Sequence, residues 1–481
     1  MNPDYREHLM RLIAPGYIAH ILSIAGFLLA LFLVARLMSE KKAPANTFAW
    51  LLVIILIPYV GVPLFLVFGG RKLRRLAERK SHLVPTLRGK SANVAVDDAG
   101  AVAQTVVSAG GSPPVAGNRL KLLTTGEEEF AALEHHIRQA QDTIHITTFI
   151  LGRDDTGRRI VALLTEKARQ GVKVRLLLDA VGCLLSSRWF VDPLREAGGE
   201  VGRFMPVLPF SSPGTANLRN HRKIAIFDHC TAIIGGRNMA REYMGPTKLK
   251  KRWVDFGTLI EGPAAALLNE IFIADWSFAT KQPAEPLHAA IPGTVTDAKG
   301  RSDLQIVASG PDVPGDPLYE GIIAMIQEAK ESILIVTTYF IPDDVLLRSL
   351  IVKARAGRQV TLVLPSHSNH PITDYARRYY TRELRKAGAK LLLFPDGMMH
   401  CKAMVVDERT AAYGSANFDL RSLFVNFEVG VLVHSPAEVR LIKAWASKLM
   451  GHCHEARTER QGRRVLGNLA EELCRLLAPL L

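Results

Sequence analysis

A pattern of six residues occurs twice in this chain of 481 residues. Each copy reads His-x-Lys, four residues, Asp, six residues, then Gly-[Gly/Ser]-x-Asn. The copies comprise His221, Lys223, Asp228, Gly235, Gly236 and Asn238, and then His400, Lys402, Asp407, Gly414, Ser415 and Asn417. Because each residue type makes up only a few per cent of proteins, one chance match has a probability of roughly 1 in 10⁴–10⁵ per chain. The repeat therefore predicts two copies of one folded unit.

The segments around the motif repeat as well. Residues 144–150, 167–178 and 194–198 correspond to 333–339, 353–364 and 384–388. Each half alternates apolar runs typical of strands with amphipathic segments of helical length, which predicts an α/β fold. The halves differ most before the motif, where the first half has a longer loop, residues 205–220. We expect this loop to form one lip of the active site.

The motif carries groups suited to a phosphodiester. On a strand, residues i and i+2 share a face, so His221 points to the same side as Lys223. The same holds for His400 and Lys402. Two imidazoles can act as nucleophile and acid, while lysines and amides such as those of Asn238 and Asn417 stabilise phosphate oxygens. Because one half supplies one histidine, we expect the halves to pack about a pseudo-twofold axis with both motifs at one pocket.

The pattern resembles the HKD motif of the phospholipase D superfamily, present here in both copies. Flanking segments are similar to the bacterial cardiolipin synthases of that superfamily: Gly117-Asn118 and residues 148–151, 241–243 and 417–422. The resemblance covers nearly the whole chain. It implies that His221 attacks phosphorus to give a phosphohistidine and that His400 acts first as acid and then as base. The sequence leaves the reverse assignment open.

Carboxylates near the motif have two different expected tasks. The resemblance gives Asp255 and Glu428 the task of orienting the histidines through the second ring nitrogen. Asp228 and Asp407 belong to the catalytic signature, but each follows an apolar strand, so we interpret them as turn caps or structural ion pairs. We expect no metal and no other cofactor, because paired lysines can replace the cation of other phosphoryl-transfer sites. The sequence has no Walker loop and no dinucleotide-binding glycine motif.

Two apolar stretches near the N-terminus, 17–35 and 47–68, predict a transmembrane helical hairpin within residues 1–70. A signal peptide ending near residue 45 is the alternative, which the charged residues before that point disfavour. Residues 71–90 hold eight basic residues and one acid. The positive-inside rule then places the catalytic domains on the cytoplasmic side of a bacterial inner membrane.

The remaining boundaries follow from composition and the repeat. Residues 71–118 are predicted to be a basic juxtamembrane segment and linker, and residues 119–290 and 291–450 two phospholipase D-like domains. Residues 451–481 form a tail whose leucines recur at helical spacing, which predicts an amphipathic helix docked on the protein core or on the membrane surface. The five cysteines show no paired spacing, so we expect free thiols.

A net charge of +14 favours an anionic partner, either lipid head groups or nucleic acid, and a hydrophobic content of 48% indicates membrane segments. We expect phosphatidyl transfer between two phosphatidylglycerols, giving cardiolipin and glycerol. The alternatives are a phospholipase D-type hydrolase, or a phosphatidyltransferase that uses another alcohol or phosphatidylethanolamine. A tethered nuclease is disfavoured, because no basic stripe with interleaved aromatic residues is present. The expected partners are phosphatidylglycerol and anionic membrane lipids, with no nucleic acid; oligomeric state and acyl-chain preference stay open.

Overall fold

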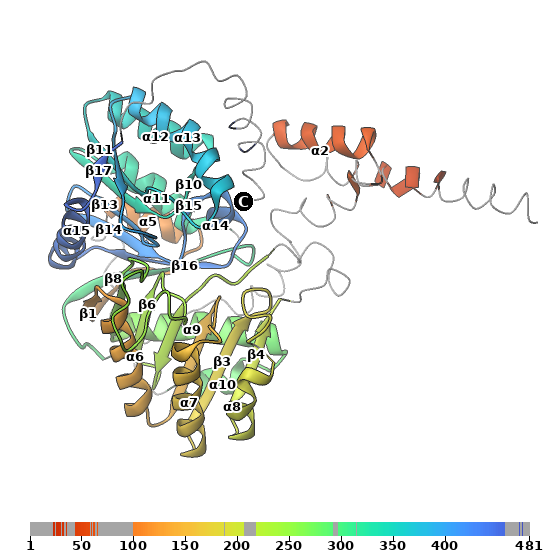
Figure 1. Cartoon of the computed structure of the whole chain (residues 1–481), viewed down its shortest axis with the longest axis vertical. Coiled ribbons are helices and arrows are strands. Elements are labelled where there is room, and N and C mark those ends of the chain that lie inside the picture. The colour runs from red at the N-terminus through yellow and green to blue at the C-terminus, as the bar shows by residue number, and fades with distance from the viewer. Residues whose placement is uncertain are drawn as a thin grey trace, which may run out of the picture. The chain divides into compact units, whose positions relative to one another are not determined.

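A computed structural model describes residues 100–456 apart from 187, 206–217, 292–296 and 314 (Figure 1). It also describes part of residues 23–65, together with Glu471 and Cys474. Most of the predicted hairpin, the basic segment up to residue 99, most of the predicted lip at 205–220 and nearly all of the predicted tail helix lie outside the described residues.

The first half of the catalytic region alternates strands with helices and ends in a long buried helix, α9. Its elements are β1 (Val115–Leu123), α6 (Gly126–Gln139), β2 (Thr143–Thr148), α7 (Asp155–Arg169), β3 (Lys173–Asp179), the 3₁₀ turn η1 (Trp189–Val191), α8 (Asp192–Glu196), β4 (Glu200–Phe204), β5 (Ile224–Phe227), β6 (Thr231–Gly235), β7 (Gly257–Glu261), α9 (Pro263–Thr280) and α10 (Glu285–Ala289).

The second half repeats this succession with three short additional strands, β10, β15 and β17, of which β10 and β15 pair with each other and β17 pairs with β12. Its elements are β8 (Ser302–Ser309), α11 (Pro317–Glu328), β9 (Ser332–Thr337), β10 (Phe340–Ile341), α12 (Asp344–Arg355), β11 (Gln359–Pro365), α13 (Pro371–Lys386), β12 (Lys390–Phe394), β13 (Lys402–Val406), β14 (Thr410–Gly414), β15 (Phe418–Asp419), α14 (Leu420–Phe424), β16 (Glu428–Val433), α15 (Pro436–Met450) and β17 (His454–Glu455).

Fifteen of the described strands form one hydrogen-bonded sheet in the order β17-β12-β11-β9-β13-β14-β16-β8-β1-β7-β6-β5-β2-β3-β4. The two halves meet where β1 pairs antiparallel with β8. Outward from that pair, the strands follow the same order in both halves, with β16, β14, β13, β9, β11 and β12 matching β7, β6, β5, β2, β3 and β4. The predicted α/β fold is therefore confirmed.

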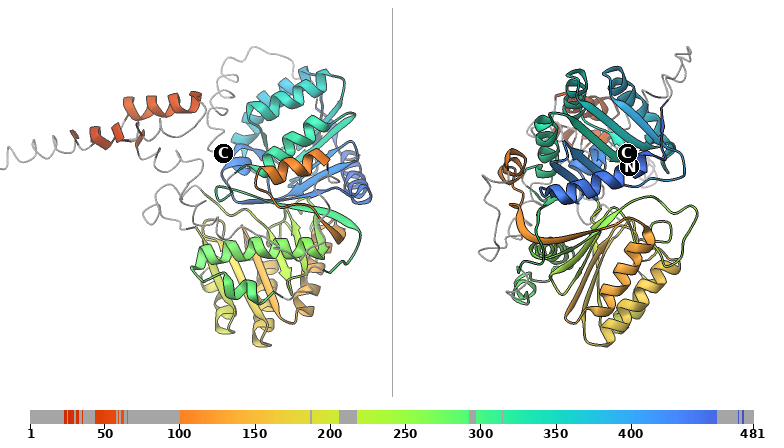
Figure 2. Two further views of the ribbon diagram at one scale, coloured as in Figure 1. Left: turned by 180° about the vertical axis from the view of Figure 1, so that it is seen from behind. Right: turned by 90° about the vertical axis from the view of Figure 1, so that its left-hand side faces the viewer.

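Helices cover both faces of the sheet and define three apolar cores (Figures 1 and 2). In the first half, α6 and α7 pack on one face and α9 lies on the other. Helix α9 is apolar around nearly its whole circumference, as expected for a helix enclosed on all sides. Its residues join those of α15 and of strands from both halves in one shared core, while each half keeps an outer core of its own. The halves are thus fused through apolar packing.

Part of the segment that we expected to be a linker is folded. Residues 100–108 form helix α5, which buries Val102, Ala103 and Val106, and β1 starts at Val115 instead of near 119. Small apolar residues fit closely between α5 and α11, so a composition that suggested mobility instead favours tight packing. Asn118 is fully buried, donates to the Val115 and Ser302 carbonyls and accepts from the Ala264 amide, which fastens β1 to β8 and α9.

Helix α2 (Pro44–Leu56) lies within the predicted hairpin and has 13 residues. Over the part of the chain that the structure describes, no helix has both the length and the apolar character needed to cross a bilayer.

Candidate active site

His221 is held by backbone contacts to the other half of the molecule. Its amide donates to the Phe427 carbonyl at 2.9 Å, and the Phe427 amide donates to the Arg219 carbonyl at 2.9 Å. These bonds set the register of the next residue, Glu428, so that its carboxylate accepts from His221 Nδ1 at 3.0 Å. The Phe149 ring meets the imidazole edge-on, with 5.2 Å between centroids. The segment just before β5 therefore presents His221 to a carboxylate that the second half supplies. His221 and Lys223 precede β5 and His400 precedes β13, so only Lys402 lies on a strand, contrary to the expectation for the motif.

His400 is held in the equivalent way by the first half. Its amide donates to the Val254 carbonyl at 2.7 Å, and the Val254 amide donates to the Met398 carbonyl at 2.9 Å. Asp255, the next residue, has its Oδ2 at 3.1 Å from His400 Nδ1. The rings of Tyr243 and Trp253 flank the imidazole, with centroids 5.1 and 5.5 Å away.

Each half thus orients the histidine of the other half. A carboxylate at Nδ1 favours the tautomer with hydrogen on that nitrogen, which leaves Nε2 with a lone pair. The sequence pointed to both acids but could not assign each acid to its histidine. Neither histidine has its acid in an isolated half.

Two buried lysines lie beside the histidines. Lys223 Nζ donates to the carbonyl of His221 at 2.6 Å, and Lys402 Nζ donates to the carbonyl of His400 and to Thr338 Oγ1 at 3.3 Å. Burial lowers the pKa of Lys223 well below its usual range and that of Lys402 to about 8, although Glu428 and Asp255 respectively oppose this. Partly desolvated ammonium groups of this kind gain strongly from an anionic ligand.

The electrostatics tie the two motifs into one site. Burial and then Lys402 lower the pKa of His400 well below its usual range, and Lys223 and His221 of the other motif add to the effect. Lys402 Nζ lies 2.9 Å from His400 Nδ1. Burial also lowers the pKa of His221, against the attraction of Glu428. The four groups therefore respond to one another's charge.

Comparison with known proteins finds a matching family model and similar chains. A family model described as "Cardiolipin synthase, PLD-like domain" matches residues 133–276 and 322–450. The chain is 34% identical over 461 residues to cardiolipin synthase 1 of Bacillus anthracis, covering 92% of this chain and 90% of that protein. It is 32% identical over 487 residues to the major cardiolipin synthase ClsA of Bacillus subtilis, covering 96% of this chain and 100% of that protein.

The chain belongs to the cardiolipin synthase family.

Two further matches concern the N-terminus and the fold. A model described as "Phospholipase_D-nuclease N-terminal" matches residues 26–70. The structure resembles a phosphatidylserine synthase from Haemophilus influenzae with a TM-score of 0.57 and 15% identity, over 75% of this chain and 94% of that one. At this identity the likeness extends to the fold alone.

The HKD aspartates of this cardiolipin synthase family member cap turns. Asp228 accepts from the amides of residues 141, 142 and 143, and Asp407 accepts from those of residues 330, 331 and 332. Both aspartates have positive φ, 46° and 50°, as the first turn residue of a strand hairpin. Each carboxylate is fully engaged in fastening the β5–β6 or β13–β14 turn to the start of the neighbouring strand. This fixes β5, which begins just after Lys223, and β13, which begins with Lys402.

The asparagines of the motif differ between the halves. Asn238 is buried, and its Oδ1 accepts from the Ile150 amide at 3.2 Å. Asn417 is also buried, but its Oδ1 has no hydrogen-bond partner within the described part of the chain. A buried carbonyl oxygen without a partner is costly in a folded protein, which favours an interaction made only when a ligand is bound.

The orienting acids also differ, because of one residue of the motif. Ser415 donates its hydroxyl to Glu428 Oε2, and Ser415 Oγ accepts from the Val429 amide at 3.0 Å. Burial would raise the pKa of Glu428, but His221, Lys223 and Ser415 hold that pKa below its usual range. In the first half, Gly236 takes the place of the serine, because a Cβ there would lie 2.4 Å from Asp255 Oδ2. Burial raises the pKa of Asp255 to about 6, against Lys402 and Arg237.

Arg222 and Arg237 are supporting residues that the sequence did not single out. Arg222 is buried and forms an ion pair with Asp275, in which Nη1 lies 2.7 and 2.8 Å from the two carboxylate oxygens. Its Nε donates to the Glu428 carbonyl at 3.0 Å. Arg237 pairs with buried Glu129 and donates to the Asp255 carbonyl. Each arginine therefore positions the backbone of an orienting acid. Their counterparts in the repeat, Cys401 and Ala416, cannot do so, and that difference was the signal available in the sequence.

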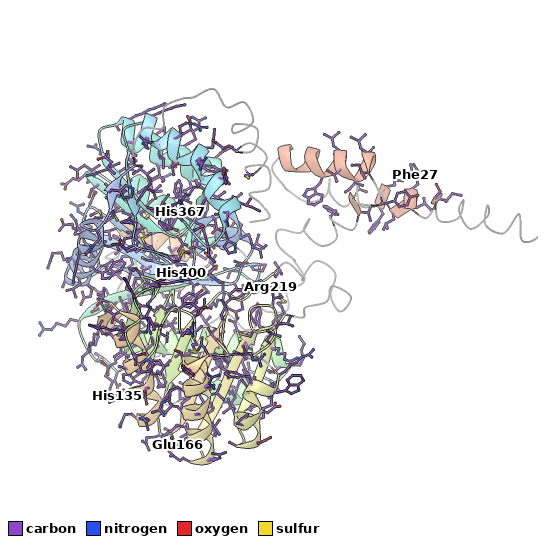
Figure 3. All side chains as sticks on the ribbon, viewed as in Figure 1. Phe27, His135, Glu166, Arg219, His367 and His400 are labelled. Carbon is purple, nitrogen blue, oxygen red and sulfur yellow. The ribbon has the colours of Figure 1, made fainter. Side chains whose placement is uncertain are left out.

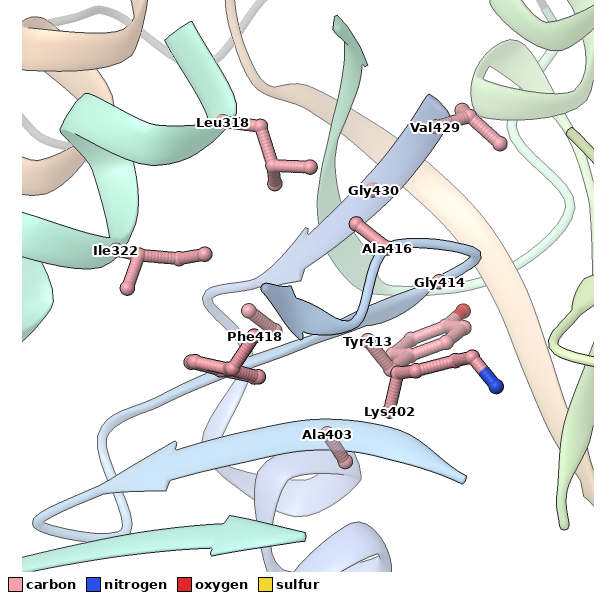
Figure 4. Close-up of a pocket in the computed structure, with 11 residues that line it drawn as sticks. Leu318, Ile322, Lys402, Ala403, Tyr413, Gly414, Ala416, Phe418, Val429 and Gly430 are labelled. Carbon is pink, nitrogen blue, oxygen red and sulfur yellow. The ribbon is translucent and has the colours of Figure 1, made fainter. Parts of the chain in front are cut away.

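The site lies where the halves meet. Figure 3 places His400 between the helical layers of the two halves, far from His135 and Glu166 at the outer end of the first half. Behind Lys402, a small apolar cavity of about 20 Å³ lies between α11 and strands β13, β14 and β16 (Figure 4). The Tyr413 hydroxyl at its edge is 2.7 Å from Thr258 Oγ1 of the first half. Within the described residues, no group of three or more His, Cys, Asp or Glu side chains is arranged to hold a metal ion.

Proposed function

We propose that this chain transfers the phosphatidyl group of one phosphatidylglycerol to the glycerol hydroxyl of another, releasing free glycerol and forming cardiolipin. The observation that carries the proposal is the pair of histidines, each hydrogen-bonded at Nδ1 to a carboxylate of the opposite half. Such a pair provides one nucleophile and one acid on opposite sides of a phosphate.

In the first step, His221 Nε2 attacks phosphorus and the bond from phosphorus to the glycerol oxygen breaks. Glu428 is suited to assist His221 as the nucleophile, since the Ser415 hydroxyl helps to keep the Glu428 carboxylate ionised and in place. The ionised carboxylate stabilises the positive charge that develops on the ring as the phosphohistidine forms.

His400 gives its Nε2 proton to the departing glycerol. Burial and Lys402 disfavour that proton in the empty site. A bound phosphate supplies negative charge and an anionic partner for Lys402, which raises the pKa of His400 and leaves Asp255 as the acceptor for Nδ1. Substrate binding therefore favours the protonated form of His400, which acts as the acid.

In the second step, neutral His400 removes the proton from a hydroxyl of the second phosphatidylglycerol, and that oxygen attacks the phosphohistidine. The bond between phosphorus and His221 breaks, cardiolipin leaves, and both histidines return to their starting states. Lys223, Lys402, Asn238 and Asn417 stabilise the equatorial phosphate oxygens in both transition states.

The alternative outcome is hydrolysis of the phosphohistidine by water, or its capture by a different alcohol or by phosphatidylethanolamine. The rings of Tyr243 and Trp253 around buried His400 favour a lipid acceptor, because they limit access of water to the general base.

We also propose how the chain is organised around this site. Two phospholipase D-like domains, 119–290 and 291–450, are related by a pseudo-twofold axis, as the matching strand order supports, with the first domain extended back to β1. Residues 1–70 form a membrane hairpin that the match over 26–70 supports, followed by a basic juxtamembrane segment. The catalytic domains face the cytoplasm at the inner membrane, and residues 451–481 form an amphipathic tail.

The test is incubation of the purified chain with phosphatidylglycerol labelled separately in the acyl chain and in the head-group glycerol. The proposal expects labelled cardiolipin and one free glycerol for each cardiolipin. Phosphatidic acid as the sole lipid product would instead identify a hydrolase. Lipid that stays intact while DNA is cleaved would identify a nuclease. Addition of unlabelled alcohols or phosphatidylethanolamine reveals a different acceptor by its product.

A further inference from the structure

Three exposed loops carry apolar or basic side chains around the active site. The first, residues 181–189, exposes Val181, Leu184, Leu185 and Trp189 by 45, 46, 68 and 80%. The second, residues 246–251, exposes Leu249 by 44% among three exposed lysines. The third, residues 369–375, comprises the two residues before α13 and the start of that helix, and it exposes Ile372 by 47% and Tyr375 by 43%. We call these segments the rim loops. Large exposed apolar side chains that are grouped around one site are typical of a surface that binds a membrane or a partner.

The first rim loop is built directly onto the His221 side of the site. Cys183 Sγ donates to the Phe149 carbonyl at 3.2 Å, and Ser186 donates its hydroxyl to the Leu151 carbonyl. Phe149 in turn packs edge-on against His221. The buried Cys183 and Ser186 hold the loop, while its leucines and Trp189 point outward into solvent.

The other two rim loops are built onto the His400 side. The Leu249 carbonyl accepts from the Arg252 amide at 3.1 Å, and the next residue, Trp253, flanks His400. In the third loop, Asn369 Oδ1 accepts from the Tyr339 hydroxyl at 2.5 Å. Tyr339 follows Thr338, whose hydroxyl accepts from Lys402. All three loops are therefore connected to catalytic groups through one or two residues.

The chemistry of the rim loops matches a lipid–water interface with negative charge. Trp and Tyr are the residues that favour this interface, and basic side chains beside them attract anionic head groups. Arg188 adjoins Trp189, and the Arg378 guanidinium lies 4.4 Å from the centre of the Tyr375 ring. Lys248, Lys250 and Lys251 surround Leu249. The first two loops contain no acid, and the acid of the third, Asp374, is paired with Arg377 at 3.2 Å.

We propose that the three rim loops seat the catalytic region on the surface of an anionic bilayer, so that a phosphatidylglycerol head group passes from the bilayer to the histidine pair without crossing water. The proposal deepens the proposed function and rests on it, since it names the surface from which that site takes its lipid. It adds a second attachment to the membrane, separate from the N-terminal segment, which sets the height and orientation of the site.

The experiment compares two substrates in the full-length chain reconstituted in vesicles. One is long-chain phosphatidylglycerol within the vesicles, and the other is short-chain phosphatidylglycerol dissolved as monomers. Leu184→Ser with Leu185→Ser and Trp189→Ser forms one variant, and Lys248→Glu with Lys250→Glu and Lys251→Glu the other. We expect vesicle turnover to fall by about tenfold or more in each, while turnover of the monomeric lipid stays within about twofold of the unaltered chain.

Matched controls come from equally exposed residues elsewhere. Val352→Ser and Leu441→Ser remove apolar side chains that are 62 and 53% exposed on α12 and α15. Lys173→Glu and Lys390→Glu reverse exposed charges at the first residues of β3 and β12. The far end of β3 leads into the first loop, and β12 runs parallel to β11, whose far end leads into the third. These controls should leave vesicle turnover unchanged. The proposal is overturned if the rim variants match the controls, or if they lower the turnover of both substrates equally.

A binding measurement separates this proposal from the proposed function. Brominated phosphatidylglycerol quenches tryptophan fluorescence at the interface, and the quenching should fall when Trp189→Phe is introduced and when brominated phosphatidylcholine is used instead. Quenching that persists in a chain without any lipid turnover would reject the proposed function alone. Trp189 that brominated lipid does not quench, or rim variants that change only the self-association of the chain, would reject the rim loops as a lipid-binding surface.

Discussion

The two halves share one catalytic motif but differ in what surrounds it. In the first half, strand β2 carries His145 in the place that Leu334 occupies in β9, and Arg222 stands where the second half has Cys401. The second half, in turn, supplies Ser415 where the first has Gly236. The histidines and lysines of the motif are the same in both halves, while the groups that hold them have diverged. His221 and His400 therefore occupy the same position of the motif but lie in different environments.

The clearest difference is a series of buried polar side chains in the first half that are hydrogen-bonded to one another. Arg175 donates to His145 Nε2 at 3.2 Å, and His145 Nδ1 lies 2.8 Å from Asn269 Oδ1. Asn269 Nδ2 lies 3.0 Å from His229 Nδ1, whose Nε2 is 3.3 Å from Thr143 Oγ1. Every member is satisfied only if both imidazoles are neutral. Burial, opposed by Asn269, lowers the pKa of His145 to about 3.

The largest effect is expected from the histidine pair itself. His221→Ala and His400→Ala should each leave less than about one per cent of turnover, because each removes a group that acts in the transition state. Residual activity above that level would remove the histidine concerned from the mechanism.

A substrate with p-nitrophenol as the leaving group then distinguishes the two roles, since that group departs without protonation. We expect His400→Ala to accumulate a trapped phosphatidyl-histidine with this substrate and His221→Ala to form none. The opposite pattern would exchange the assigned roles.

The next largest effect is expected at Arg222, whose equivalent in the second half is Cys401. Arg222→Cys installs the residue of the second half and leaves the buried Asp275 carboxylate without the guanidinium that neutralises it. We expect a loss of about 3–5 kcal/mol in the free energy of unfolding, measured by chemical denaturation. Truncation at the equivalent position of the second half, Cys401→Ala, should cost about 1 kcal/mol, because it removes a single buried sulfur. Equal losses would contradict a special role for the Arg222 ion pair in joining the halves.

The buried histidine of the first half should make the protein acid-sensitive. The pKa of His145 is about 3 in the folded state against a usual value of 6.5, so the unfolded state binds the proton first as pH falls. Stability from this group is present above pH 6.5 and is lost below it, by about 2 kcal/mol at pH 5.

His145→Leu, which copies the second half, should reduce the change in unfolding free energy between pH 7.5 and 5 by that amount. The exposed His367 provides the control, since its replacement should leave the pH dependence unchanged. A slope that His145→Leu does not alter would show that other groups carry the acid sensitivity.

The smallest effect tests the difference between the orienting acids. Ser415→Ala removes the hydroxyl that helps to hold Glu428, so we expect turnover to fall by about tenfold. The pKa of Glu428 should rise, because a hydrogen bond that stabilises the ionised form is lost. The acidic limb of the pH–rate profile should therefore move to higher pH. An unchanged profile with full activity would show that Ser415 does not position Glu428.

The repeat made much of this protein predictable. A pattern kept at every spacing requires that the same side chains occupy the same places in two folded units, so the α/β character of both units followed from it. The N-terminal boundary of the first unit did not, because small apolar residues such as those of α5 resemble a linker until the partner helix is known. The predictions about residues 205–220 and the leucine-rich tail concern segments that lie mostly outside the described residues.

The sequence by itself determined which groups are candidates for contact with the phosphate, because the chemistry demands these residue types and the chain repeats them at the same spacing. Only the tertiary structure decided that Glu428 serves His221 and that Asp255 serves His400. That pairing arises from backbone hydrogen bonds between segments about 150 to 200 residues apart. No local pattern encodes such contacts, since they depend on how the shared core of α9 and α15 brings the halves together.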